Sequence, residues 1–302
     1  MIRLANVITH DGTFHSDELF ACALLKRFYS SDLAITRTRD VDKLNIGLMD
    51  PNVFVIDVGG QYNFKMLNFD HHFKKHCKYW HNEKSLQMSS CGLVWTFLKK
   101  KGFLKKFNKS QLRSLEQRLI KRIDAHDTGT GKYGIWKPSI IFSGYNRSVN
   151  NDQQFKKALS VACDVLDNYI QFVISESRVE SSFNKVSFKL IDKNILFVPE
   201  RIDGLMKYVS KKTSAKVVIR PRLTEDNKEL WVCESVFREK SEILLAPLEL
   251  CGIDGELLKS ITDIPGLTFC HSGGHLAICS DKESAILMAK LMVRSKSYSR
   301  IK

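Results

Sequence analysis

Short apolar runs alternate with amphipathic segments along the first 130 residues, and this alternation restricts the folds open to the chain. Residues 3–10, 33–38 and 52–60 have the length and composition of buried strands. Residues 17–29 carry apolar side chains on one face and predict a helix between the first two strands. Strands and helices alternate in this way when helices cover a parallel sheet. We therefore predict an α/β fold with a parallel sheet flanked by helices.

Further helices are indicated by capping residues and apolar periodicity. Ser89-Ser90 offers an N-cap for a helix that Gly102 closes, and Ser110 offers another for a helix that ends at Ile123. A long helix, with apolar residues at three- and four-residue steps, is predicted over about 152–180.

The 302 residues are enough for two hydrophobic cores. We expect an N-terminal parallel-sheet domain over 1–150, a helical linker over 151–185 and a smaller α/β (α+β) domain over 186–302. The last of these contains strand patterns between shorter helices.

Composition favours a soluble protein with no membrane association. Apolar residues make up 43% of the chain, and no apolar run approaches the length of a membrane span. The first ten residues lead straight into a predicted strand, so we expect no targeting sequence and a cytoplasmic or nuclear location. None of the eight cysteines forms a Cys-x-x-Cys pair, which argues against a zinc knuckle or a disulfide framework.

The charge balance favours a polyanionic partner. With 47 Lys and Arg against 33 Asp and Glu, the formal net charge is +14, which attracts nucleic acid through long-range electrostatics and counterion release. The run Lys99-Lys100-Lys101 could follow a phosphate backbone, although a solvated helix end is the simpler reading.

Residues 9–18, THDGTFHSDE, gather two histidines, two aspartates and a glutamate after the first predicted strand. His10 and His15 are five residues apart, which corresponds to about 140° around a helix, so they must converge from a loop. Asp17 then lies at the start of the next helix. Glu18 could support this site or be a surface residue favoured by the helix dipole.

Three more segments repeat this chemistry. Asp57 ends the third strand, the segment NFDHHFKK contains Asp70, His71 and His72, and IDAHDTG contains two aspartates and a histidine. We expect all four clusters to follow successive strands, where open α/β sheets bind their ligands.

The motifs THDGTFHSDE, VIDVGG, DHH, SSCGLVW and IDAHDTG, in this order and spacing, resemble the Myg-type (melanocyte-proliferating-gene) nuclease family of the DHH phosphoesterase superfamily. The likeness continues into ELLKSITDIPGLTFCHSG near the C-terminus and so covers nearly the whole chain. It implies a two-metal phosphodiesterase with an N-terminal DHH catalytic domain, a helical connector and a C-terminal substrate-binding domain.

The resemblance also implies roles for individual residues. The implied metal ligands are His10, His15, Asp17, Asp57, His71 and Asp127. Asp124 is the alternative to Asp127 as the last ligand. Asp70 should orient the neighbouring metal-bound histidine, and His72 could stabilise the phosphoryl charge or protonate the leaving oxygen.

Carboxylates and imidazoles without thiolates suit Mn²⁺ or Mg²⁺, and the imidazole share favours Mn²⁺. Two such ions in one active site could activate a hydroxide and clamp the attacking and leaving oxygens of an in-line displacement, so no protein nucleophile is required.

Candidate substrate contacts lie outside the ligand set. They are Lys74, Lys75, Arg147, His271, Gly273, Gly274 and His275. Family members carry a Gly-Gly segment near the last strand, and an ungapped reading places Ala277-Ile278 there instead. Gly273-Gly274-His275 lies four residues earlier and could replace that segment or form a turn.

The leading hypothesis is a 3′-5′ exoribonuclease that hydrolyses single-stranded RNA or short oligonucleotides. One alternative is a small-molecule phosphoesterase acting on a short oligonucleotide, cyclic dinucleotide, nucleoside bisphosphate or pyrophosphate. Another is a non-catalytic nucleic-acid-binding protein. The sequence also leaves a homodimer open.

Overall fold

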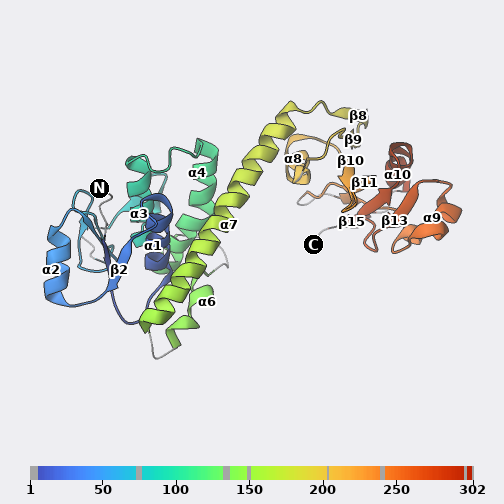
Figure 1. The fold of residues 1–302 in the computed structure, drawn as a ribbon. Coiled ribbons are helices and arrows are strands. Elements are labelled where there is room, and N and C mark those ends of the chain that lie inside the picture. The colour runs from blue at the N-terminus through green and yellow to red at the C-terminus, as the bar shows by residue number, and fades with distance from the viewer. Residues whose placement is uncertain are drawn as a thin grey trace. The chain divides into compact units, whose positions relative to one another are not determined.

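The computed structural model describes residues 6–72, 77–131, 137–147, 151–202, 204–238, 242–295 and 298–300. The chain divides into two compact units, residues 1–175 and 176–302. The division falls inside the long helix α7 (Asn151–Lys185) rather than at either of its ends (Figure 1). Within the described residues, no helix has both the length and the apolar character needed to cross a bilayer.

The first unit is built on a five-stranded sheet with the order β2-β1-β3-β5-β4. Strands β1, β2, β3 and β5 are parallel, and β4 is antiparallel to β5. The sheet strands are β1 (Asn6–Thr9), β2 (Ala34–Arg37), β3 (Val53–Ile56), β4 (Tyr62–Asn63) and β5 (Asn68–Phe69). The helices are α1 (Ser16–Phe28), α2 (Val41–Met49), α3 (Ser90–Lys100), α4 (Lys109–Leu115), α5 (Lys121–Thr128) and α6 (Ser139–Phe142). A two-stranded ribbon, β6 (Tyr79–Trp80) and β7 (Glu83–Gln87), precedes α3.

Strand β3 shows why this sheet is covered on both faces. Its four side chains are all buried, and they alternate between two separate cores. Val53 and Val55 pack with Leu48 of α2, whereas Phe54 and Ile56 join the larger core formed with α1, α3 and α7. A continuous apolar strand is what a helix-covered parallel sheet requires, so the α/β fold with a parallel-sheet core is confirmed.

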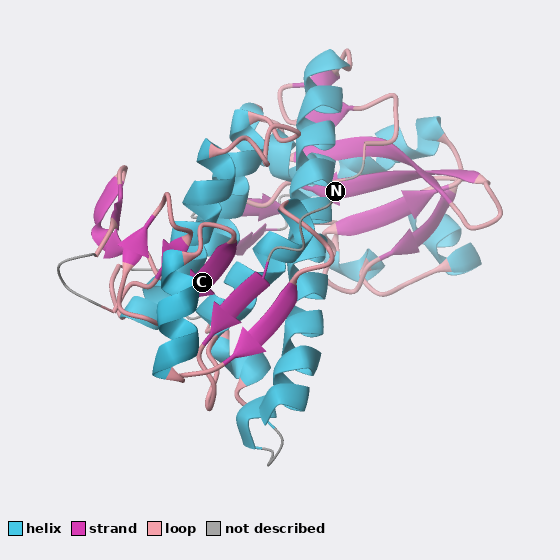
Figure 2. Cartoon of the chain, turned by 60° about the vertical axis from the view of Figure 1, so that its left-hand side comes forward, coloured by secondary structure: helices cyan, strands magenta, loops and turns pink. Residues whose placement is uncertain are grey.

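The second unit has a six-stranded sheet with the order β13-β14-β11-β10-β9-β8. Figure 2 draws the strands of the chain in magenta and its helices in cyan. All neighbours are antiparallel except β9 and β10, which are parallel. The sheet strands are β8 (Lys189–Asp192), β9 (Ile195–Phe197), β10 (Val217–Leu223), β11 (Glu229–Ser235), β13 (Leu267–Cys270) and β14 (Leu276–Cys279). The helices are α8 (Leu205–Lys212), α9 (Gly255–Thr262) and α10 (Lys282–Ser295), and a separate strand pair joins β12 (Glu242–Leu244) to β15 (Tyr298–Arg300).

Strand β9 again separates two cores. Ile195 packs with Met288 of α10, whereas Leu196 packs with Leu205 of α8 and with Phe183 near the end of α7. Helices therefore cover both faces of the second sheet as well.

Several elements differ from the sequence-based expectations. The helix expected from Ser110 is capped by Asn108, whose side chain accepts the backbone N–H of Gln111 at 2.9 Å. It also does not end at Ile123, because α4 continues through a π-helical turn into α5, which ends at Thr128. Helix α2 and the short strands β4 to β7 were not predicted, because their patterns are too short to show periodicity.

A buried carboxylate holds the start of α3. Asp124 of α5 accepts hydrogen bonds from the Ser89 hydroxyl at 2.6 Å, the Gly92 N–H at 3.0 Å and the indole N–H of Trp80 at 2.7 Å. A Cβ atom on Gly92 would lie 2.1 Å from one Asp124 oxygen. Only glycine therefore permits this approach between α3 and α5.

Gly92→Ala should destabilise the protein, although alanine has the higher helix propensity by about 1 kcal/mol. The new methyl group must displace the Asp124 carboxylate, and such overpacking costs roughly 1–3 kcal/mol, to which the broken hydrogen bonds add. Urea denaturation would measure the change. Gly144→Ala is the matched control, because no heavy atom lies within 4 Å of its added Cβ. Equal stability of both variants would contradict this account.

Candidate metal centre

The parallel strands bring three of the expected ligands to one edge of the first sheet. His10 follows β1, Asp57 follows β3, and His71 comes two residues after β5. Because β1, β3 and β5 are parallel neighbours, their carboxyl ends lie side by side. The topology thus places these side chains where open α/β sheets bind ligands.

Asp57 is the central residue of the cluster. Its backbone has a φ of 59°, a left-handed conformation that turns the chain sharply at the end of β3. One carboxylate oxygen lies 3.3 Å from Nε2 of His10, and the other lies 3.2 Å from Nε2 of His71 and accepts the Ser90 hydroxyl at 3.0 Å. Burial alone would raise the pKa of Asp57, but the bonds from the two histidines outweigh it and lower the pKa below its usual value.

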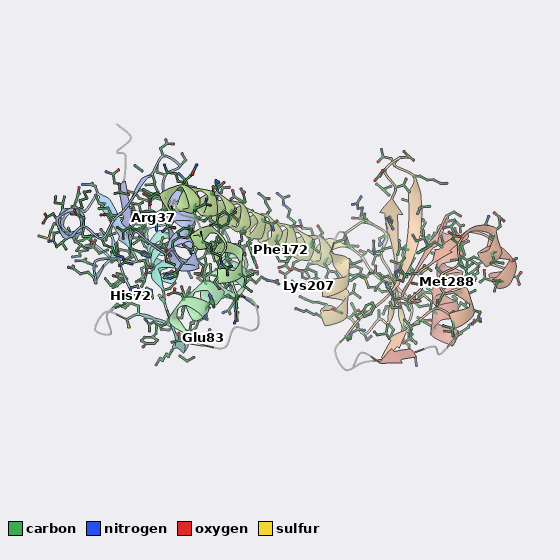
Figure 3. The ribbon with its side chains drawn as sticks, turned by 90° about the horizontal axis from the view of Figure 1, so that it is seen from below. Arg37, His72, Glu83, Phe172, Lys207 and Met288 are labelled. Carbon is green, nitrogen blue, oxygen red and sulfur yellow. The ribbon has the colours of Figure 1, made fainter. Side chains whose placement is uncertain are left out.

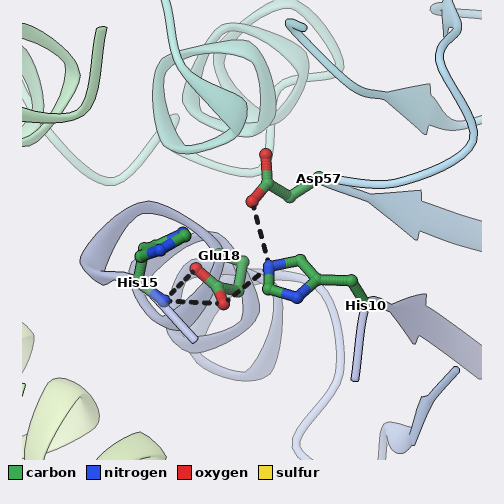
Figure 4. A group of neighbouring side chains, drawn as sticks. All are labelled: His10, His15, Glu18 and Asp57. Carbon is green, nitrogen blue, oxygen red and sulfur yellow. Dashed lines mark hydrogen bonds and ion pairs between the residues drawn. The ribbon is translucent and has the colours of Figure 1, made fainter. Parts of the chain in front are cut away.

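His10 and Glu18 form one side of the cluster, as Figure 4 shows. Nε2 of His10 lies 3.1 Å from a Glu18 oxygen, and both side chains are almost completely buried. The Glu18 carboxylate also accepts the backbone N–H of His15 at 2.8 Å, which fixes the start of α1. Burial would lower the pKa of His10, but its bonds to Asp57 and Glu18 raise it to about 10.

His71 joins the other side of the cluster to α5. Its Nε2 lies 3.1 Å from Asp127 and 3.7 Å from Asp17. Burial would lower the pKa of His71, but the bonds to Asp127 and Asp57 raise it to about 10. Asp127 lies in the last turn of α5, so the expectation that all four clusters follow strands is wrong for this one.

Asp17 provides the test of whether these residues fit a metal. Its side chain is fully buried, and neither carboxylate oxygen has a hydrogen-bond partner among the described residues. Burial, together with the charges of Asp57, Asp127 and Glu18, raises its pKa well above the usual value. Nε2 of His71 lies 3.7 Å away, too far for a hydrogen bond. A buried carboxylate without hydrogen-bond partners is costly unless a bound cation neutralises it. The unpartnered oxygens therefore fit a bound cation.

Among the described residues, three groups of side chains have the spacing of a metal-ligand set. Within each group, one ligand atom per residue lies within 4.8 Å of all the others. The groups are His10-His15-Glu18-Asp57, Asp57-His71-His72 and His15-Asp17-Asp127. All six ligands expected from the sequence thus meet around a common centre. Oxygen and imidazole donors without thiolate suit a divalent cation such as Mn²⁺ or Mg²⁺.

Asp70 contacts a different histidine from the one expected. Its carboxylate lies 2.7 Å from Nδ1 of His72 and accepts the backbone N–H of Gly60 at 2.7 Å, whereas no described contact joins it to the His71 ring. The His72 side chain remains 60% exposed and lies in the first unit (Figure 3). Asp70 therefore orients His72, because the chain turn after β5 points successive side chains in different directions.

Asp124 and Asp127 have different surroundings. The two oxygens of Asp124 are engaged by Trp80, Ser89 and Gly92, and burial raises its pKa to about 7 despite these bonds. Asp127 instead contacts His71 inside the cluster. This geometry favours Asp127 over Asp124 as the ligand.

Among the cavities that the described residues line, two reach the centre. The larger, of about 720 Å³, is lined by cluster residues His15, His71 and Asp127 and also by His126, Ser143 and Asn146. The smaller, of about 240 Å³, is lined by His10, Asp57, Gly60 and His72 among others. Residues of the cluster therefore line both cavities.

The expected substrate contacts are spread over the chain. Lys74 and Lys75 lie outside the described residues. Arg147 is exposed, whereas its neighbour Asn146 lines the larger cavity and exchanges hydrogen bonds of 2.7 and 3.0 Å with the backbone of Phe14.

The four remaining candidates form a turn in the second unit, between β13 and β14. The rings of His271 and His275 are 4.3 Å apart, and Nδ1 of His271 accepts the Gly273 N–H at 2.9 Å. Gly274 has a φ of 64°, a left-handed conformation that glycine adopts without strain, so its role here is to form the turn.

Sequence reasoning missed the residues that hold the cluster in place. Ser90 lies in the motif SSCGLVW but was not assigned a contact to Asp57. Arg37 ends β2, and its guanidinium donates to the Gly12 carbonyl at 2.6 Å and to Asp152 at 2.9 Å (Figure 3). An arginine at the end of a predicted strand was the available signal, but its burial and its partner carbonyl cannot be read from sequence.

The fold and the site together define an α/β protein with a candidate divalent-metal centre at the carboxyl edge of a parallel sheet. Residues 6–293 match the model of the MYG1 exonuclease family, an uncharacterised protein family (UPF0160). The chain belongs to this family.

Curated relatives agree with this assignment along most of their length. The MYG1 protein of Chlamydia trachomatis is 29% identical, with 96% of this chain and 97% of the relative covered. The MYG1 exonuclease of Homo sapiens is 24% identical, with 96% and 86% covered. A solved pGpG-specific phosphodiesterase from Vibrio is similar over 96% of this chain and 98% of its own, but the TM-score of 0.32 and the identity of 11% are too low to carry an argument.

Asp17→Asn should raise the melting temperature of the metal-free protein and remove most of its stabilisation by Mn²⁺. The pKa of Asp17 is raised in the folded state, so its charged form opposes folding at neutral pH. In the wild type, Mn²⁺ at 100 times its Kd should stabilise the fold by about 2.7 kcal/mol. Thermal melts in EDTA and in Mn²⁺ would measure both effects.

Asp42→Asn is the control for this experiment, because Asp42 is exposed in the first turn of α2. It should change the free energy of unfolding, in EDTA or in Mn²⁺, by no more than the roughly 0.5 kcal/mol of a helix-dipole contact. An Asp17→Asn variant that is stabilised by Mn²⁺ as strongly as the wild type would exclude Asp17 as a ligand.

Arg37→Met should weaken Mn²⁺ binding by roughly tenfold. This is the lower end of the loss in metal affinity that usually follows when a residue supporting metal ligands is replaced. The Arg37 side chain is 3% exposed, lies over the rings of Phe14 and Phe155, and holds the loop that carries His10 and His15. Calorimetric titration with Mn²⁺ would measure the change. Asp152→Asn keeps the bond to Gly12 and should bind Mn²⁺ nearly as the wild type does.

Proposed function

We propose that the protein is a metal-dependent phosphodiesterase and acts as a 3′-5′ exoribonuclease on single-stranded RNA. The observation that carries this proposal is the position of Asp57, whose two oxygens face His10 on one side and His71 on the other. One carboxylate shared by two ligand groups is the arrangement that a two-ion hydrolase needs. The exonuclease names of relatives and the net charge of +14 support a nucleic-acid substrate.

The shared carboxylate divides the ligands into two sets. His10 and His15 would hold one ion together with Asp57, and His71 would hold the other together with the same carboxylate. Asp17 and Asp127 lie with His15 in a further group, and Asp127 also contacts His71, so these two carboxylates would complete the ligand shells. When bound, Mn²⁺ or Mg²⁺ would supply a water of lowered pKa and Lewis-acid stabilisation of the phosphoryl charge. Glu18 holds the His15 backbone and the His10 ring, so its role is to position these ligands.

His72 is placed to act on the substrate. Its imidazole is exposed at the edge of the cluster, and Asp70 fixes one ring nitrogen at 2.7 Å. The contact raises the pKa of His72, which favours the protonated ring at neutral pH. A protonated, oriented imidazole can donate to a phosphoryl oxygen or protonate the leaving oxygen. Asp70 is then a positioning residue.

The size of the larger cavity favours a second candidate function, hydrolysis of a small phosphoester such as a cyclic dinucleotide or a nucleoside bisphosphate. Its volume of about 720 Å³ lies within the range typical of small-molecule sites. Such an enzyme would cleave the small compound faster than a long RNA.

End-labelled RNA incubated with the purified protein would test the proposal. We expect shortening in Mn²⁺ or Mg²⁺ and none in EDTA. A 5′ label should give a descending ladder, whereas a 3′ label should appear at once in mononucleotides, since cleavage starts at the 3′ end. Asp57→Asn should abolish shortening, because it removes the carboxylate that two of the three ligand groups share.

Asp42→Asn serves as the matched carboxylate control and should retain full activity. Intact but retarded RNA under all conditions would instead identify a binding protein. Preferential cleavage of a cyclic dinucleotide or bisphosphate would favour the second candidate function.

A further inference from the structure

A basic and aromatic surface lies beside the metal centre in the first unit. It consists of Tyr62, Phe64, Lys78, Lys100 and Lys101, and we call it the Phe64 patch. The Lys100 and Lys101 ammonium groups lie 5.7 and 5.5 Å from the centre of the Phe64 ring. The Lys78 ammonium group lies 5.3 Å from the centre of the Tyr62 ring. Three ammonium groups, one from the segment before β6 and two from the end of α3, therefore gather on the short β4–β5 hairpin.

The positive charge of this patch is not neutralised by neighbouring carboxylates. All three lysines are exposed, and within the described parts of the chain none forms an ion pair. Their neighbour Lys99 differs, because its ammonium group lies 2.6 Å from Glu116. A solvated helix end needs no aromatic platform, so the contacts to Tyr62 and Phe64 distinguish this surface from an incidental lysine run.

The two rings are held firmly enough to serve as a platform. Both are partly buried, with Phe64 packed at 5.3 Å against Phe97 and Tyr62 at 6.1 Å against Phe69. Rings anchored in this way keep part of their surface available at a small cost in conformational entropy.

The patch continues from the smaller cavity of the metal centre. Gly60 lines that cavity and donates its N–H to Asp70, and Tyr62 follows two residues later, a distance of about 7 Å along an extended chain. Helix α3 gives a second measure. It runs from Ser90, which contacts Asp57, to Lys100, so the far end of the patch lies roughly 15 Å along the helix from the centre.

We propose that the Phe64 patch binds the 5′ side of a single-stranded RNA whose 3′ end lies in the metal centre. Ammonium groups would contact phosphates, and the two rings would stack on bases, which is how proteins hold single strands without reading their sequence. At about 3.4 Å per stacked nucleotide, roughly four to five nucleotides span the 15 Å. The inference rests on the proposed nuclease function and adds a second contact region for long substrates.

The test compares Lys100→Ala/Lys101→Ala with the wild-type full chain. Fluorescence anisotropy in EDTA would measure binding of a labelled 12-nucleotide RNA over a salt series. Each lost phosphate contact lowers the slope of log K against log salt by about 0.7, so we expect a fall of about 1.4. The Kd at low salt should rise roughly tenfold. Hydrolysis of a dinucleotide should be unchanged, because it is too short to reach the patch.

Lys156→Ala/Lys157→Ala is the matched control, since it removes two adjacent exposed lysines from α7 in the same unit. It should keep the wild-type salt slope. An unchanged slope in the Lys100→Ala/Lys101→Ala variant, or an equal loss in the control, would overturn the proposal. So would a loss of binding to phosphatidylserine vesicles with RNA binding intact, which would identify a membrane surface instead.

The two proposals can fail separately. If the wild type hydrolyses no RNA but the patch variant still loses affinity for the 12-nucleotide RNA, the nuclease function fails and the RNA contact stands. If RNA is hydrolysed and the variant binds it as the wild type does, the nuclease function stands and the RNA contact of the Phe64 patch fails.

Discussion

Mutual repulsion among buried carboxylates is the constraint on which the arrangement of the first unit depends. Asp17, Glu18 and Asp57 are almost entirely excluded from water and lie close to one another. His10 and His71 compensate part of this charge, and Asp17 is left without a hydrogen-bond partner inside the described ranges. Such a cluster opposes folding unless cations complete it. The buried carboxylates lower the stability of the metal-free fold, so their role is best explained by the proposed metal binding.

The backbone reduces this electrostatic cost. Asp17 and Glu18 lie in the first turn of α1, and Ser90, the hydroxyl partner of Asp57, is the first residue of α3. The positive ends of both helix dipoles thus face the carboxylates. The same helix starts are fixed by side chains, because Glu18 accepts the His15 N–H and Asp124 accepts the Gly92 N–H. Helix capping and ligand placement are one structural feature here.

Much of the fold, and the gathering of the candidate ligands at one edge of the sheet, could be predicted from the sequence, because apolar strands and the motif residues that follow them are local signals. The β3 run and Asp57 show this directly. Contacts across the fold could not be predicted in this way. The pairing of Asp70 with His72 depends on the turn after β5, and the bond from Arg37 to Gly12 depends on loop closure. Short strands such as β4 lack the length to show a period, and so the Phe64 patch became visible only in three dimensions.

Helix α7 has a consequence for the order in which the chain acquires structure during synthesis. Its side chains from Phe155 to Val173 complete the core beneath α1 and α3, whereas Phe183 belongs to the core of the second unit. A nascent chain of 150 residues therefore lacks one wall of its first core and remains open to chaperones or proteases. That core can close only after about 25 more residues leave the ribosome. The remaining turns of α7 then form the first part of the core of the second unit.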